Sequence, residues 1–193
     1  MKHIKSIEKS LKDKLSHKEI VRKVYLTYPT SALVDNEEMQ YEILNEISQH
    51  FKIPINHVQV CGSAKVGQSF HKVSKFTKKI SDLDIAIIDP HLFLRYSELV
   101  FDITNGLQDY TKFTTSKGNN SLSYTQYISK GIFRPDFMPT CPQRASWFSF
   151  FNKLSLRHNH FFKSINAGIY NSQIFFEHKQ SSNIRDFINQ IKK

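Results

Sequence analysis

Residues 81–88, which read SDLDIAII, constrain the fold more than any other stretch of this chain. The run Leu83–Ile88 is apolar after Asp84, as is typical of a strand that is buried on both faces. Residues two apart on a strand point to the same side, so Asp82 and Asp84 direct both carboxylates to one face, about 7 Å apart. A sheet that contains this strand needs other elements to cover it.

Periodicity and capping signals supply those elements. His57–Val60 alternates as a second strand. Helices are expected from Asp35-Asn36 to Lys52-Ile53-Pro54 and from Asp89-Pro90 to about Asn105-Gly106. A turn is expected at 117–120, followed by strand-like stretches between 121 and 138 that are interrupted at 130–131.

Both terminal regions show helical spacing. Near the N-terminus, apolar residues lie on one face among lysines, which favours a surface helix that packs one stripe on the core: Ile4, Ile7, Leu11 and Leu15. A helix that binds nucleic acid or a membrane surface is the alternative. After Pro142 the pattern is helical, as at Trp147, Phe150, Phe151 and Leu154. The sequence predicts a single α+β domain: a small mixed sheet flanked by helices, with a helical segment over 1–52, a core over 53–140 and C-terminal helices over 141–193.

Composition narrows the function. The chain has 193 residues, 39% of them hydrophobic and 13% aromatic, which is enough for a folded core. Lysine plus arginine number 27 against 17 aspartates plus glutamates, a net charge of +10 that suggests nucleic acid, a nucleotide phosphate or an acidic protein as partner. Cys61 and Cys141 form no CxxC pair, so zinc is not expected. No apolar run approaches the roughly 18 residues that cross a bilayer, and the charged N-terminus does not fit a secretion signal, so a cytoplasmic protein is expected.

The aspartate pair predicts a metal site. Two like charges this close repel each other unless a cation lies between them. Magnesium takes oxygen ligands and usually binds one or two carboxylates together with substrate phosphates. Gly62-Ser63, directly after the 57–60 strand, provides a place where backbone and a hydroxyl can approach a phosphate. Separately, each pattern is more often an ordinary turn or a solvated pair; together they favour metal-assisted phosphate chemistry.

This combination resembles the polymerase β-type nucleotidyltransferase superfamily. The resemblance rests on VCGS at 60–63 and SDLDI at 81–85. It implies a third carboxylate on a later strand, for which Asp136 in RPDFMP at 134–139 is the best match; Asp102 is the rival, inside an expected helix. Small bacterial nucleotidyltransferase-like proteins with a GSAKxG motif are the closer likeness, and Trp147 matches their tryptophan-containing helix. One departure is the spacing of 82 − 63 = 19 positions between Ser63 and Asp82.

The resemblance also implies residue roles. Asp82, Asp84 and Asp136 would hold two Mg²⁺ or Mn²⁺ ions, while the triphosphate would be held by Gly62, Ser63, Lys65 and Ser81. The basic loop at 71–79 either folds over the nucleotide and contacts phosphate or is a solvated loop; its lysines are Lys72, Lys75, Lys78 and Lys79.

The resemblance therefore implies a magnesium-dependent enzyme that moves a nucleoside monophosphate from a nucleoside triphosphate to an acceptor hydroxyl. Three acceptors stay open: a protein side chain, an RNA end or a second nucleotide. A bacterial defence or toxin–antitoxin role would fit the likeness. The alternative is a catalytically silent module of the same fold that binds nucleic acid or a partner protein.

Overall fold

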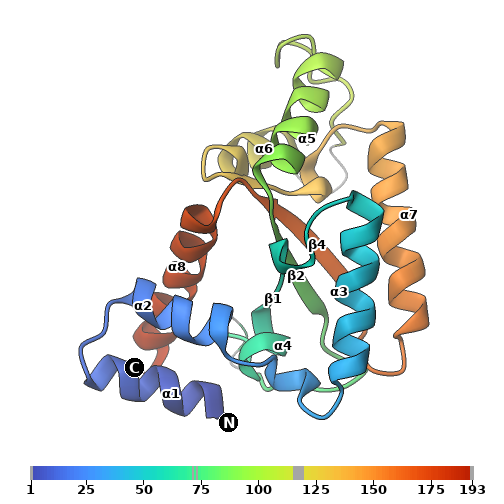
Figure 1. The fold of residues 1–193 in the computed structure, drawn as a ribbon. Helices are drawn as coiled ribbons and strands as arrows, with labels where there is room; N and C mark the ends of the chain where they lie inside the picture. The colour runs from blue at the N-terminus through green and yellow to red at the C-terminus, as the bar shows by residue number, and fades with distance from the viewer. Residues whose placement is uncertain (1, 71, 73, 115–119, 192–193) are drawn as a thin grey trace.

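The computed structural model describes residues 2–70, 72, 74–114 and 120–191. Over these residues the protein is α+β, with eight helices around a mixed, open four-stranded sheet (Figure 1). The strands are β1 (Val58–Cys61), β2 (Leu83–Ile88), β3 (Ile132–Phe133) and β4 (Ile165–Tyr170). Among the described residues, no helix combines the length and the hydrophobicity that a membrane span requires.

The helices begin and end close to their sequence signals. Asp89 caps the helix that starts at Pro90, and its carboxylate accepts a hydrogen bond from the Leu92 amide at 2.6 Å. Lys52 ends the third helix in the left-handed conformation. The helices are α1 (Lys2–Lys12), α2 (His17–Val21), α3 (Glu37–Phe51), α4 (Gly62–Val66), α5 (Pro90–Ile103), α6 (Asn120–Ile128), α7 (Pro142–Arg157) and α8 (Gln173–Ile191).

The strand order is β1-β2-β4-β3. β2 pairs antiparallel with β1 and parallel with β4, and in the latter register Asp84 lies opposite Asn166. β3 pairs antiparallel with the far side of β4. The strands predicted at 57–60 and 83–88 are confirmed as β1 and β2, and they are neighbours in the sheet. The segment that carries Asp136 does not lie beside β2, because β4 separates them.

The two faces of β2 belong to different apolar clusters. Leu83, Ile85 and Ile87 pack with residues of α3 and α7, whereas Ala86 packs with residues of α1, α2 and α8. Figure 1 shows α3 and α7 together on one side of the sheet and α1, α2 and α8 on the other. The prediction of a strand buried on both faces is therefore confirmed, and Asp84 lies on the α8 face because it alternates with Leu83 and Ile85.

The N-terminal stripe packs as a surface helix would. Ile4 and Ile7 of α1 are buried in the cluster that also holds Ile184 and Phe187 of α8. Leu11 and Leu15 are partly buried against the same cluster. The N-terminal segment thus shares its apolar contacts with the C-terminal helix, and the predicted packing of one helix face is confirmed.

Two predictions of secondary structure are wrong. Before the expected interruption at 130–131, the segment forms α6 instead of a strand, because Tyr124 packs on Phe113 and Phe133 from a helix and tertiary contacts override its β propensity. After the interruption the expected strand is present as the two residues of β3. The region after Pro142 is not all helical, since β4 runs through it. Of the expected turn at 117–120, residues 117–119 lie outside the described residues.

Candidate functional site

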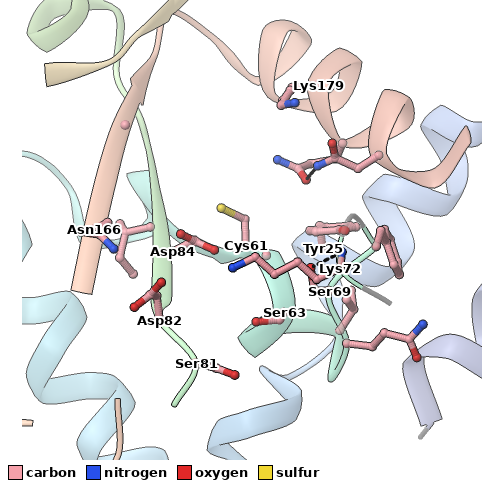
Figure 2. A pocket seen from close by; sticks show the side chains of 18 of the residues that line it. Tyr25, Cys61, Ser63, Ser69, Lys72, Ser81, Asp82, Asp84, Asn166 and Lys179 are labelled. Carbon is pink, nitrogen blue, oxygen red and sulfur yellow. Dashed lines mark hydrogen bonds between the residues drawn. The ribbon is translucent and has the colours of Figure 1, made fainter. Parts of the chain in front are cut away.

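Asp82 and Asp84 stand at the N-terminal end of β2, where the sheet opens into a cavity of about 790 Å³. The predicted residues Gly62, Ser63 and Ser81 line this cavity together with both aspartates. In Figure 2, the side chains of Asp82 and Asp84 point into the space between the sheet, the segment that carries Ser63, and α8 with Lys179. The structure therefore brings five of the predicted site residues together around one opening.

The Asp82 carboxylate is oriented by the neighbouring strand segment. Ser164 Oγ donates to Asp82 Oδ1 at 2.8 Å, and Asn166 Nδ2 donates to Ser164 Oγ at 2.8 Å. The Leu83 amide donates to the Ser164 carbonyl at 2.8 Å and fixes the two segments side by side. Among the described residues, Asn166 Oδ1 accepts no hydrogen bond, so it is an available acceptor beside Asp84, the partner of Asn166 in the β2–β4 register.

The Asp84 carboxylate is held by contact instead of hydrogen bonds. Gly62 has φ +64°, and a Cβ atom added there would lie 2.2 Å from Asp84 Oδ2, so only glycine leaves room for this carboxylate. Within the described part of the chain, no donor makes a hydrogen bond to Asp84. Burial raises the pKa of Asp84 and the charge of Asp82 raises it further, while Arg134 and Lys72 lower it.

Lys65 points away from the cavity. Its side chain is buried, Nζ donates to the Tyr28 carbonyl at 2.7 Å, and burial lowers the pKa of the ammonium to about 8. Residues two positions apart along an α-helix point to roughly opposite sides. In α4, position 65 therefore faces the N-terminal segment while position 63 faces the opening. The predicted contact of Lys65 with phosphate is not supported by this placement.

Asp136 is likewise separate from the carboxylate pair. It lies in the short helix Pro135–Phe137 after β3, outside the cavity lining, and its Oδ2 accepts from Nε and Nη2 of Arg134 at 3.1 and 2.7 Å. Among the described residues, no three histidine, cysteine, aspartate or glutamate side chains are grouped as metal ligands. The structure thus does not support the expected three-carboxylate site. The rival Asp102 is exposed on α5, as its position in a helix predicts.

Only part of the positive charge of the basic loop at 71–79 lies at the cavity. Lys72 and Lys75 line the cavity, whereas Lys78 Nζ lies 4.4 Å from the centre of the Phe161 ring. The backbone amide of Lys79 donates to the Phe161 carbonyl. Residues 71 and 73 of this loop lie outside the described residues, and its contact with a nucleotide stays a prediction.

Several cavity residues had no clear sequence signal. Lys163 reaches the opening from just before β4, Asn166 from β4 itself and Lys179 from α8. Asn166 and Gly168 interrupt the apolar pattern of β4, which hides the strand and with it the neighbour of Asp84. Arg134 was visible in the sequence as the neighbour of Asp136, but its own place in the cavity was not predicted.

Comparison of the chain with protein-family models, with curated proteins and with solved structures finds no match.

Proposed function

We propose that this protein is a nucleotidyltransferase that moves a nucleoside monophosphate from a nucleoside triphosphate to an acceptor hydroxyl. One observation carries the proposal: Asp82 and Asp84 face a common cavity, with Gly62 packed closely against Asp84, and Ser63 and several cationic side chains line the same opening. Carboxylates serve as metal ligands, and cations and hydroxyls serve as phosphate ligands. A polymerase β-like core is the finer fold that this arrangement favours.

The donor set fits a hard divalent cation. Asp84 is partly buried, is repelled by Asp82, and has no hydrogen-bond donor among the described residues, so its oxygens are available to a metal. Asn166 adds a neutral amide oxygen beside it. Asp82, Asp84 and Asn166 would hold Mg²⁺ or Mn²⁺, which supplies charge neutralisation at the phosphates and activation of the attacking hydroxyl.

The other cavity residues bind and orient the substrate. Ser63 and Ser69 present hydroxyl groups, and Lys72 and Lys75 bring positive charge, on the side of the opening formed by α4 and the loop that follows it. These groups suit a triphosphate, because their positive charges and hydroxyl donors offset the repulsion between its negative charge and the two aspartates. Ser164 keeps Asp82 in one orientation while the substrate enters. With a volume of about 790 Å³, the cavity lies in the range typical of ligand sites.

A silent binding module is the second candidate, and one observation favours it. The strand next to Asp84 carries Asn166 where a third carboxylate would complete the metal site. A site with two carboxylates binds a metal more weakly than a site with three, because each carboxylate adds a full negative charge. In this case the cations of the cavity would hold a nucleotide or nucleic acid without turnover.

Labelled transfer separates the two candidates. Each nucleoside triphosphate, labelled at its α-phosphate, is incubated with the protein, Mg²⁺ or Mn²⁺, and either cell RNA or cell protein. We expect transfer of label from one nucleotide, reduced about a thousandfold or more in Asp82→Asn and Asp84→Asn. Asp102→Asn, an exposed aspartate on α5, is the matched control and should act as wild type.

The product identifies the acceptor, since label in RNA, in protein or in a small nucleotide product each points to a different class. Nucleotide binding without transfer to any acceptor would support the silent module. Equal transfer by wild type and Asp84→Asn would contradict the proposed site.

A further inference from the structure

Arg134 differs from the lysines of the cavity in being held in place. Its Nε and Nη2 both donate to Asp136 Oδ2, and its guanidinium carbon lies 5.8 Å from the centre of the Tyr127 ring. The Arg134 side chain is itself 39% exposed, so its contacts and not its burial set it apart. Among the described residues, the side chains of Lys72, Lys75 and Lys163 are exposed and make no hydrogen bond or ring contact. A long side chain that is already ordered loses less conformational entropy when it binds a ligand.

The sheet makes room for this arginine. Gly168 of β4 lies opposite Ala86 of β2, and a Cβ atom added at Gly168 would lie 3.2 Å from Arg134 Cδ. Gly168 also shares a strand face with Asn166, because the two are two residues apart. The stem of Arg134 therefore lies over the same face of the sheet as Asp84, one strand away.

The guanidinium has donors to spare. It carries five N–H groups in a planar fork, and Asp136 accepts from only two of its nitrogens. Within the described chain, no hydrogen bond joins Arg134 and Asp84, so that carboxylate does not use the remaining donors. Its remaining donors match the oxygens of a phosphate, which guanidinium groups bind in bidentate fashion.

From these contacts we infer that Arg134 binds the terminal diphosphate of the nucleoside triphosphate, the part that leaves as pyrophosphate, and that Asp136 positions it. The inference rests on the proposed function for the identity of the nucleotide. It gives Asp136 a different role from the metal ligand expected from the sequence: its carboxylate orients the Arg134 guanidinium and does not hold a metal ion.

Binding of tripolyphosphate and of pyrophosphate, measured by calorimetry in the presence of a chelator, tests this site without turnover. We expect Arg134→Gln to raise the dissociation constant of tripolyphosphate about 10- to 100-fold. Arg134→Lys should recover only part of the loss, because it restores the charge but not the fork. Arg95→Gln is the matched control, since Arg95 also lies by a tyrosine ring, 5.9 Å from the centre of Tyr96, but outside the cavity.

Asp136→Asn tests the positioning role. Alone it should weaken tripolyphosphate binding, and in the Arg134→Gln background it should have no further effect, because the two residues act as one unit. Effects that add in the double variant would overturn the positioning role. Unchanged binding in Arg134→Gln, with a wild-type melting profile, would overturn the site itself.

This inference and the proposed function fail in different ways. If no acceptor receives label but tripolyphosphate binding depends on Arg134, the phosphate site stands and the transfer reaction does not. If label is transferred and Arg134→Gln leaves both KM for the nucleotide and tripolyphosphate binding unchanged, the reaction stands and this site does not. Inorganic phosphate serves as a further arm: binding as tight as that of pyrophosphate would overturn the assignment to a diphosphate.

Discussion

The two ends of β2 carry the same residue type in opposite situations. Asp89, after the C-terminal end of the strand, is 4% exposed, and its oxygens accept hydrogen bonds from the Leu92 amide at 2.6 Å and from His57 Nδ1 at 2.9 Å. Asp84, near the N-terminal end, is partly buried and lacks a hydrogen-bond donor among the described residues. One carboxylate is therefore part of the folded scaffold, while the other is left available to a ligand.

This contrast teaches how a structural acid is distinguished from a functional one. A buried carboxylate without a partner is unfavourable, and such groups persist where the surrounding structure holds them for another purpose. At Asp89 the partners belong to the same fold, so the free energy of the interaction contributes to stability. At Asp84 the close approach of Gly62 leaves space for the carboxylate without satisfying it.

The largest effect on stability is expected at the structural end. Asp89→Ala should lower the free energy of unfolding by about 3 kcal/mol, because it removes a helix cap and leaves the buried Leu92 amide without an acceptor. Urea denaturation measures this loss, with Asp102→Ala as the control on the exposed face of α5. Per folded molecule, nucleotide transfer should be unchanged. A loss below 0.5 kcal/mol, a threshold set by ordinary surface substitutions, would remove the contrast between the two ends.

Gly62→Ala should have the next largest effect. The left-handed backbone at this position costs about 1 to 2 kcal/mol for a residue with a Cβ atom. The added methyl group also displaces the Asp84 carboxylate, so the rise of the melting midpoint on addition of Mg²⁺ and nucleotide should be lost. Gly106→Ala is the control, because Gly106 also has positive φ but its added Cβ atom would meet only the Phe101 ring, at 3.5 Å. A retained ligand response in Gly62→Ala would show that the close approach at Asp84 is not needed.

The smallest effect is a gain in stability at the functional end. The pKa of Asp84 is raised in the folded protein, first by burial and then by Asp82, so this group binds its proton more tightly when folded. Its contribution to stability is complete below the ordinary pKa near 3.8 and is lost as pH rises through the folded pKa. Without metal, Asp84→Asn should therefore be more stable than wild type at neutral pH, by less than about 1 kcal/mol. The difference should shrink as pH falls, which thermal melts across pH with chelator present can follow.

A variant that melts well below wild type in chelator would show that Asp84 is a structural residue like Asp89. Asp82→Asn is a useful companion, because it removes the repulsion on Asp84 but also breaks the hydrogen bond from Ser164. The stability of this variant relative to wild type shows which is larger, the relief of the repulsion or the loss of the hydrogen bond that orients Asp82.

The sequence was informative wherever a local pattern decides the structure. The buried run of β2, the cap at Asp89 and the helix of 37–51 depend on neighbours a few residues away, and all are observed. β4 was missed because Asn166 and Gly168 break its apolar pattern. Its pairing with β2 depends on backbone register, which a short window of sequence does not contain.

The site follows the same division. Gly62, Ser63, Ser81 and the two aspartates reach one cavity because β1 and β2 are adjacent antiparallel strands. The sequence patterns predicted the two strands but not the direction in which they pair. The resemblance implied a third carboxylate on a later strand, but Asp136 follows β3, and β4 lies between β3 and β2. The same strand decides two other positions: Asn166 lies on β4, and the stem of Arg134 packs on Gly168 of β4.

The hydrogen bond that orients Asp82 has a consequence for how the protein is made. Its donor, Ser164, lies 82 positions later in the chain. At a synthesis rate of 5 to 20 residues per second, the ribosome needs roughly 4 to 16 s to bridge that interval. Until then the nascent chain has β1 and β2 but lacks β4, so one edge of β2 is unpaired and open to wrong strand partners. The orientation of the carboxylates therefore arises late in synthesis, with the long-range pairing that closes the sheet.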